Sequence, residues 1–268
     1  MADRYFLATP IAADRATLAG PEAHHLIHVM RAAPGLKVVL FDGSGAEFHA
    51  SVDRVGRSEV ELAILTREEI DRELPLDLTL GVALPKGERQ KWLVEKAVEL
   101  GVTRLAPLRT QRGVAQPVEQ ALVRLRRAVI EASKQCGRNR LMQIEEPQSW
   151  PDFVAAAANA PCRLLAHPQR ACEPEFAIAS RLQDSRVLTN SSALTNSRGL
   201  TAPGACPADT LPTRVLLAVG PEGGFADDEL ARAVAAGWRT VDLGPRILRV
   251  ETAALLLVAI VIEKGVGP

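Results

Sequence analysis

The amino-acid sequence predicts an α/β fold in which helices cover a parallel sheet, preceded by a small β-rich domain. From residue 78 onward, short apolar runs alternate with segments of helical periodicity, as in strands that are joined by crossover helices. Before residue 66, short strand-like runs follow one another with turn residues between them, which is typical of a small barrel. We therefore expect two domains, comprising residues 1–72 and 73–268.

The first domain should contain one helix among short strands. We expect strands at residues 4–8, 36–41, 46–52 and 59–65. The helix is expected at 22–31, behind Pro21, because proline is tolerated in a first helical turn. Residues 66–75 are mostly charged and end in proline, so we expect a linker there.

The second domain alternates regularly between the two kinds of element. We expect strands at residues 78–84, 104–110, 163–168, 215–219 and 240–244, and helices at residues 88–101, 119–136, 227–237 and 251–264. This alternation predicts a parallel sheet with helices on both faces. Residues 183–213 break the pattern, because they are rich in Ser, Thr, Asn, Gly and Pro, and we expect a flexible surface insertion there.

Composition limits the possible classes of protein. The 268 residues carry 32 basic and 32 acidic side chains, so any nucleic-acid site must come from a local patch and not from the net charge. The four cysteines form no CxxC pair, which disfavours structural zinc and fits a reducing compartment. The N-terminus does not have the pattern of a signal peptide, and the longest apolar run, 253–262, is too short to span a bilayer. We expect a cytoplasmic protein.

Two glycine-containing loops are the most informative local feature. The apolar run 215–219 stops at Gly220-Pro221-Glu222-Gly223-Gly224, and a helical segment follows from Asp227. Glycines let the backbone approach a ligand closely and adopt positive φ. A second loop, 243–249, follows the next expected strand and leads into the last helix. Neighbouring loops at one sheet edge can form the walls of a pocket, with Arg246 and Arg249 near its mouth.

Simpler interpretations and other ligands have to be weighed against such a pocket. Either loop can also be a tight strand–helix turn without a ligand. Neither loop is GxGxxG and the chain has no GxxxxGK[ST], which disfavours a dinucleotide-binding enzyme and a P-loop NTPase. The chain also lacks GxSxG, so covalent hydrolase chemistry has no support. His167, at an expected strand end, can line the pocket or simply end the strand.

Basic residues concentrate in the expected helix 119–136 and the residues after it. Residues 124–140 hold six cations, Arg124, Arg126, Arg127, Lys134, Arg138 and Arg140, against the single acid Glu131. Such a cluster is typical of phosphate contact, although a solvated helix face is the simpler alternative. His24 and His28 have a metal-binding spacing, but without an evident third ligand a surface or RNA-facing helix is favoured.

Several separated motifs together resemble a known family. They lie at residues 24–32, 84–102, 131–138, 219–225 (VGPEGGF) and 243–253 (LGPRILRVETA). In this order they resemble the RsmE family, methyltransferases of the SPOUT superfamily that modify N3 of a uridine in 16S ribosomal RNA, the small-subunit RNA. The likeness covers nearly the whole chain, and the segment 183–213 is its main departure.

The resemblance implies a SPOUT-type domain whose parallel sheet contains a deep trefoil knot, and an N-terminal PUA-like domain that binds RNA. It also implies a homodimer with an active site built across the subunit interface, S-adenosylmethionine as the cofactor, and no metal. The two glycine loops and the start of the last helix would hold the cofactor, together with Leu84 and His167. The residues expected there are Leu84, His167, Gly220, Pro221, Glu222, Gly223, Gly224, Leu243, Gly244, Ile247, Leu248 and Thr252.

In the reaction that the resemblance implies, uracil N3 loses a proton and attacks the methyl group of the cofactor. Arg249 is expected beside the charge that develops on the uracil oxygens or beside the target phosphate, and Glu222 is expected as the base or as a group that orients its loop. The residues expected to bind RNA are Arg31, Lys86, Arg89, Arg126, Arg127, Lys134 and Arg138. Two rival classes are a non-catalytic RNA-binding ribosome-assembly factor and a nucleotide-dependent oxidoreductase, and the missing GxGxxG opposes the second.

Overall fold

A computed structural model describes residues 3–114, 119–168 and 213–265. The chain forms two compact units, each of which is described here by itself. The N-terminal unit comprises residues 1–73 and 127–141, and the C-terminal unit comprises 74–126 and 142–268. Residues 127–141 therefore group with the first unit, although we assigned them to the second domain from the sequence. Nearly all of the expected insertion, residues 183–212, lies outside the described part of the chain.

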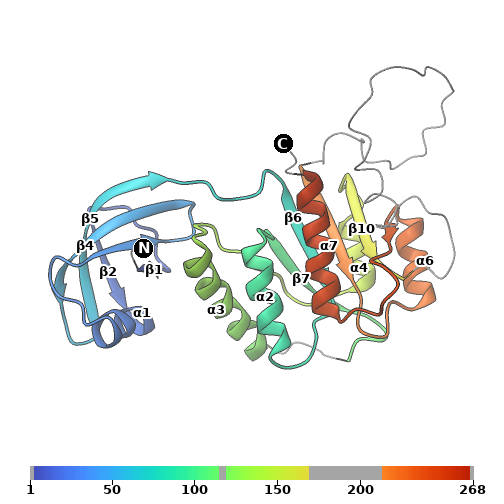
Figure 1. The fold of residues 1–268 in the computed structure, drawn as a ribbon, viewed down its shortest axis with the longest axis horizontal. Coiled ribbons are helices and arrows are strands. Elements are labelled where there is room, and N and C mark those ends of the chain that lie inside the picture. The colour runs from blue at the N-terminus through green and yellow to red at the C-terminus, as the bar shows by residue number, and fades with distance from the viewer. Residues whose placement is uncertain (1–2, 115–118, 169–212, 266–268) are drawn as a thin grey trace, which may run out of the picture. The chain divides into compact units, whose positions relative to one another are not determined.

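The N-terminal unit is built on a five-stranded sheet with the order β1-β3-β4-β5-β2 (Figure 1). Its strands are β1 (Arg4–Phe6), β2 (Arg15–Ala19), β3 (Lys37–Phe41), β4 (Ala46–Val55) and β5 (Glu59–Glu69). The β1–β3 pair is parallel and the other pairs are antiparallel. A short helix, α1 (Gly20–His24), continues into a π-helical turn at His25–Val29. Alternate side chains of the strands, such as Val60 and Leu62 on β5, fill the core with Tyr5 and Leu26.

One expectation for this unit was wrong, and one strand was not predicted. The segment 66–75 is not a linker throughout, because Thr66–Glu69 continue β5 and pair with Ala46–His49 of β4. Strand β2 was not predicted, because its short sequence Arg-Ala-Thr-Leu-Ala carries little β-branched or aromatic signal. Its burial alternates between Ala16 and Leu18 inside and their neighbours outside, so tertiary packing stabilises the strand.

The C-terminal unit contains a fully parallel sheet, which confirms the predicted α/β class. The main strand order is β12-β10-β11-β6-β7-β8, with β9 beside β7. The strands are β6 (Asp77–Val82), β7 (Arg104–Arg109), β8 (Gln143–Ile144), β9 (Gln148–Ser149), β10 (Cys162–Ala166), β11 (Arg214–Val219) and β12 (Arg239–Val241). The trefoil knot that the resemblance implies stays a prediction.

Helices cover both faces of this sheet (Figure 1). They are α2 (Arg89–Glu99), α4 (Trp150–Ala156), α6 (Asp227–Ala235) and α7 (Val250–Gly265). A further helix, α3 (Glu119–Cys136), is divided between the two units, and its residues from Arg127 onward belong to the N-terminal unit. Helix α7 packs on α2 and on β6, β10 and β11. On β11, Leu216 and Ala218 belong to the core that contains Trp150 and Phe153 of α4, whereas Leu217 between them points to the opposite face. No helix in the described residues is long and apolar enough to cross a membrane.

One glycine in the sheet is required by this packing. A Cβ on Gly81 of β6 would lie 2.5 Å from the ring of Phe153, closer than atoms can approach. The absent side chain therefore lets α4 lie directly on the sheet. Helix α4 was not predicted from the sequence, although Ser149 caps it by accepting a hydrogen bond from the Asp152 backbone N–H.

Candidate functional site

Three neighbouring strands bring three predicted segments to one edge of the parallel sheet. Ala166 of β10 is paired with Val219 of β11 on one side and with Val241 of β12 on the other. The segments that follow, starting at His167, Gly220 and Asp242, therefore begin side by side at the carboxyl ends of the strands. We call the segments 167–168, 220–225 and 242–249 the loop edge. In open α/β sheets, ligands bind in this position.

The structure extends the loop edge to the neighbouring strand β6. The backbone N–H of Ala83, just after β6, donates to the Val219 carbonyl at 3.0 Å, which places Leu84 beside the start of loop 220–225. The backbone N–H of His167 donates to the Val241 carbonyl at 3.1 Å. The fold thus brings together the segments that carry the predicted ligand residues Leu84, His167, Gly220–Gly224, Leu243, Gly244, Ile247 and Leu248.

A segment that was not predicted to take part fixes loop 220–225 from the side. Arg112, shortly after β7, donates from Nη1 to the carbonyl oxygens of Gly223 at 3.0 Å and Phe225 at 3.2 Å. Its neighbour Gln111 donates its backbone N–H to the buried Glu229 carboxylate at 2.8 Å, and the same carboxylate accepts from the Ala226 N–H at 2.9 Å. Residues 111–112 therefore hold the loop and the first turn of α6 together. No local sequence motif predicts this role, because the hydrogen-bond partners lie more than a hundred positions apart along the chain.

The glycines of the loop edge serve different purposes. A Cβ on Gly220 would lie 2.9 Å from the Phe225 ring, so glycine is needed there for packing inside the loop. Gly224 and Gly244 have φ of 69° and 107°, the left-handed region that disfavours other residues. Among the described residues, no atom lies within 4 Å of a Cβ built on either of these two. The described part of the chain therefore leaves the backbone open at both positions, as close approach of a ligand requires.

His167 contributes a partly buried neutral group to the loop edge. Burial lowers the pKa of its imidazole, and the nearby carboxylates of Asp227 and Asp242 offset this only in part. Within the described chain its Nδ1 is buried and has no hydrogen-bond partner. A buried nitrogen without a partner is costly, so this position suits a polar group of a ligand.

The charged residues of the loop edge are arranged around Arg89. Its Nη1 lies 3.3 Å from Oε1 of Glu222 and 3.6 Å from Oε1 of Glu251. Arg249 is exposed just before α7, and its carbonyl accepts the Ala253 N–H at 2.9 Å. Ile247 is 94% exposed, although it is a large apolar residue. Exposed apolar and cationic groups beside open space can contact a ligand or another chain.

Apart from Arg89, which pairs with Glu222 and Glu251, the residues predicted to bind RNA fall into two groups. Arg31, Lys86, Arg126 and Arg127 are exposed, although Arg126 also pairs with Glu146 at 2.8 Å. By contrast, the Arg138 side chain is only 5% exposed and is bound to Glu73, and Lys134 is largely buried between Glu22 and Glu131. Both cations already have carboxylate partners, which makes them less accessible to a phosphate than the exposed group. Contact of Arg138 and Lys134 with RNA stays a prediction, and the structure gives both a role within the N-terminal unit.

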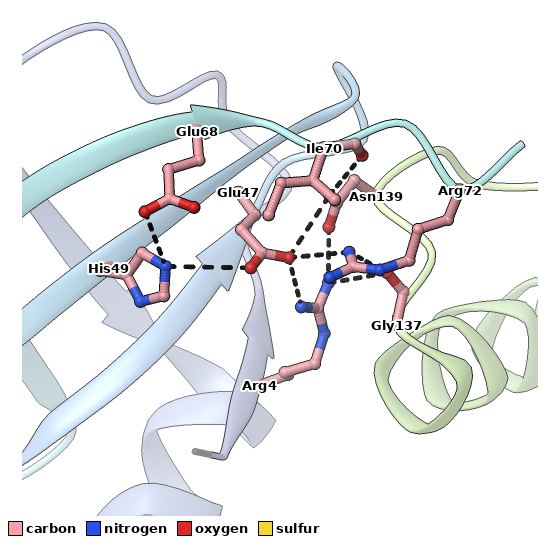
Figure 2. A network of polar contacts seen from close by, with 8 residues as sticks. All are labelled: Arg4, Glu47, His49, Glu68, Ile70, Arg72, Gly137 and Asn139. Carbon is pink, nitrogen blue, oxygen red and sulfur yellow. Dashed lines mark hydrogen bonds and ion pairs between the residues drawn. The ribbon is translucent and has the colours of Figure 1, made fainter. Parts of the chain in front are cut away.

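The motif 131–138 and the residues after it form part of a polar cluster inside the N-terminal unit (Figure 2). At its centre, the buried Glu47 carboxylate accepts hydrogen bonds from Arg4 at 2.8 Å and Arg72 at 3.0 Å. Arg4 also donates to Asn139 at 2.6 Å, and Arg72 donates to the Gly137 carbonyl at 2.9 Å. We call Arg4, Glu47, Arg72, Gly137 and Asn139 the Glu47 cluster. It joins the segment after α3 to β1 and β4.

Two guanidiniums stabilise the charged form of Glu47 in this cluster. Burial alone would raise the pKa of Glu47, but the hydrogen bonds from Arg4 and Arg72 outweigh it and hold the pKa below its usual value. On the other side of the carboxylate, His49 lies 3.9 Å from Glu47 and 3.4 Å from Glu68. The motif that seemed to be a phosphate-binding surface therefore includes a structural tie within the N-terminal unit.

Matches to known proteins define the class of the molecule. A family model described as an RNA methyltransferase domain matches residues 72–262, and one described as an RNA methyltransferase PUA domain matches residues 18–65. A parallel α/β unit with glycine loops at one sheet edge, preceded by a PUA domain, is thus an RNA methyltransferase of SPOUT type.

Curated relatives identify the family within this class. The ribosomal RNA small subunit methyltransferase E of Synechocystis sp. is 31% identical, over 91% of this chain and 71% of that relative. The Mycobacterium bovis protein of the same name is 32% identical, over 89% of this chain and 82% of its own. The chain belongs to the ribosomal RNA small subunit methyltransferase E family.

Solved structures agree with this assignment. The ribosomal RNA small subunit methyltransferase E of Neisseria gonorrhoeae, solved bound to S-adenosyl methionine, has a TM-score of 0.76 and 28% identity, covering 97% of this chain and 96% of that one. A Legionella pneumophila protein that is described as a methyltransferase was solved with bound SAM. It has a TM-score of 0.78 and 28% identity, and the match covers 98% of this chain and 97% of that one. The predicted family is therefore confirmed.

Proposed function

We propose that this chain transfers a methyl group from S-adenosylmethionine to N3 of a uridine in 16S ribosomal RNA. The family to which the chain belongs supports the reaction, and two similar structures were solved with this cofactor. The observation in this chain that carries the proposal is the loop edge, where three segments meet beside open space at Gly224 and Gly244.

The residues of the loop edge fit the proposed cofactor. Left-handed glycines at 224 and 244 allow its close approach to the backbone, and His167 offers a neutral imidazole with an unpaired buried nitrogen. Partly buried leucines can contact its apolar parts. We assign to the cofactor Leu84, His167, Gly220, Pro221, Glu222, Gly223, Gly224, Leu243, Gly244, Ile247, Leu248 and Thr252.

When bound, S-adenosylmethionine supplies a methyl group that is already activated by the positive sulfur. The chain has to orient the uracil and favour the loss of its N3 proton. Arg249 is exposed at the start of α7, where its cation can stabilise the negative charge that spreads to the uracil oxygens. Glu222 is proposed as the proton acceptor or as a group that orients loop 220–225. Correct alignment of the reactants can contribute about 7–11 kcal/mol to the lowering of the barrier.

We also propose that the protein acts as a cytoplasmic homodimer with a trefoil knot in its C-terminal domain, which starts near residue 73. Helix α7 keeps Leu255, Leu256 and Ile260 partly exposed, and Trp92 of α2, the helix that packs on α7, is 46% exposed. A second copy covering these residues would remove apolar surface from water. Analytical ultracentrifugation tests the dimer.

The RNA is proposed to contact the exposed cations Arg31, Lys86, Arg126 and Arg127. Because each phosphate contact releases counterions, binding should weaken steeply as salt is raised. A flat salt dependence would contradict these phosphate contacts.

Ribosomal RNA from cells that lack this protein provides the test of function. Mass spectrometry should show the loss of one 3-methyluridine from small-subunit RNA, and its return when the gene is restored. The alternative is a non-catalytic assembly factor, for which the modification would persist. Stabilisation by S-adenosylmethionine separates the two as well, because a ligand that binds only the native state raises the unfolding temperature.

A further inference from the structure

Arg89 joins the loop edge to the start of α7, two regions that are formed by distant parts of the sequence. It lies at the start of α2, whereas Glu222 lies in loop 220–225 and Glu251 lies in the first turn of α7. One nitrogen, Nη1, is 3.3 Å from the Glu222 carboxylate and 3.6 Å from the Glu251 carboxylate. A single guanidinium therefore connects the loop after β11 to the first turn of α7, which directly follows the loop after β12.

Burial of Glu251 makes this connection more than a surface contact. Its side chain is only 8% exposed, and within the described part of the chain Oε2 has no hydrogen-bond partner. A buried carboxylate without a compensating cation is strongly unfavourable. Arg89 supplies that compensation, together with the positive end of the α7 helix dipole. The pair with Glu222 is more exposed and weaker, so Glu251 sets the position of Arg89 and Arg89 in turn restrains Glu222.

We propose that Arg89 is a positioning residue that sets the spacing of the two cofactor-binding loops, and that it is not a ligand for the RNA backbone as its charge suggested. This inference rests on the proposed function of the loop edge. A guanidinium suits the role because it stays charged and presents several N–H groups in a rigid plane. Without it, loop 220–225 would occupy its binding-competent position for only part of the time, and the apparent affinity would fall by that fraction.

The experiment compares Arg89→Gln with Lys91→Gln, which removes an exposed cation from the same helix. Calorimetric titration measures the dissociation constant for S-adenosylmethionine, and filter binding at several salt concentrations measures the affinity for 16S RNA. We expect Arg89→Gln to raise the dissociation constant for S-adenosylmethionine by roughly 10-fold, as for a competent state populated about a tenth of the time, without changing the salt slope. Lys91→Gln should bind S-adenosylmethionine like the wild type.

A double-variant cycle distinguishes positioning from a general loss of stability. Glu251→Gln removes the buried end of the connection at a residue that is not assigned to the cofactor, and should weaken cofactor binding no more than Arg89→Gln does. Because both act through the same contact, Arg89→Gln with Glu251→Gln should bind no more weakly than Arg89→Gln alone. Arg89→Lys should restore only part of the affinity, since an ammonium lacks the planar fork. If Arg89→Gln fails to fold, Glu251→Gln with Arg89→Lys completes the comparison.

Three results would overturn the proposal. The first is an unchanged dissociation constant for S-adenosylmethionine in Arg89→Gln. The second is a salt slope for RNA reduced by about one unit, which is the mark of a lost phosphate contact. The third is a double-variant cycle in which the two single variants' fold-changes in the dissociation constant for S-adenosylmethionine multiply in the double variant. If the wild-type protein itself took up no S-adenosylmethionine, the proposed function would fail, and the role of Arg89 in cofactor binding would fail with it.

Discussion

Replacing Glu47 with glutamine should destabilise the N-terminal unit strongly. The side chain of Glu47 is 7% exposed and that of Arg4 is 10% exposed, so the substitution breaks a buried ion pair and not a surface one. The change keeps one acceptor oxygen but removes the charge that Arg4 and Arg72 share. Arg4 would then remain buried with only neutral partners, which are the glutamine oxygen, Asn139 and the Gly137 carbonyl.

The size of the effect follows from this burial. Removing one member of a buried ion pair typically costs about 3–5 kcal/mol, because the other charge is left uncompensated. Glutamine still accepts one hydrogen bond and Arg72 is partly exposed, so we expect a loss at the lower end of this range. We expect the free energy of unfolding to fall by about 3 kcal/mol at pH 7.

Urea unfolding followed by circular dichroism measures this loss, with Glu69→Gln as a control that removes an exposed acid from β5. The pH dependence provides a second check. Since the pKa of Glu47 is lowered in the folded state, its contribution is complete above the unfolded value of 4.5 and is lost as pH falls through the folded value. The difference between wild type and Glu47→Gln should therefore shrink below pH 4.5. A loss under about 1 kcal/mol, or a difference that does not change with pH, would refute this reasoning.

Three further predictions concern the loop edge. Arg249→Ala should lower turnover far more than it lowers affinity for S-adenosylmethionine, as measured by methyl transfer and calorimetry, and unchanged methylation would remove Arg249 from the site. Burial lowers the pKa of His167 in the folded state, so below the unfolded value of 6.5 the unfolded state binds more protons and the free energy of unfolding should fall as pH drops. His167→Gln should make the free energy of unfolding less dependent on pH in this range, and an equal pH dependence in urea titrations of the two proteins would contradict the prediction. Gly220→Ala forces a Cβ against Phe225 and should cost about 1–3 kcal/mol of stability, whereas Gly224→Ala should cost about 1–2 kcal/mol and act mainly by weakening cofactor binding. A larger loss of cofactor affinity in Gly220→Ala than in Gly224→Ala, measured by calorimetry, would be evidence against these roles.

The sequence was most informative where structure depends on local pattern. Alternation of apolar runs with helical segments predicted the parallel sheet, and glycines after two apolar runs predicted loops at one edge. Strand β2 and helix α4 were missed because both are short and depend on packing, β2 on its pairing with β5 and α4 on contact with Gly81.

Roles of individual charges could not be predicted in the same way. Arg138 and Lys134 looked like phosphate ligands, but their partners Glu73 and Glu22 lie 65 and 112 positions away along the chain. Arg89 and Glu222 are separated by 133 positions. A local count of charges cannot distinguish a cation that is free to bind RNA from one that is neutralised by a distant carboxylate, because only the fold brings the two together.

Methyl transfer by the purified protein tests the central claim most directly. Small ribosomal subunits that lack the modification would be incubated with the protein and S-adenosylmethionine carrying an isotopically labelled methyl group, and the RNA would then be digested for mass spectrometry. The account predicts label in 3-methyluridine at a single position. Absence of label, or label on a ribose or on another base, would contradict it.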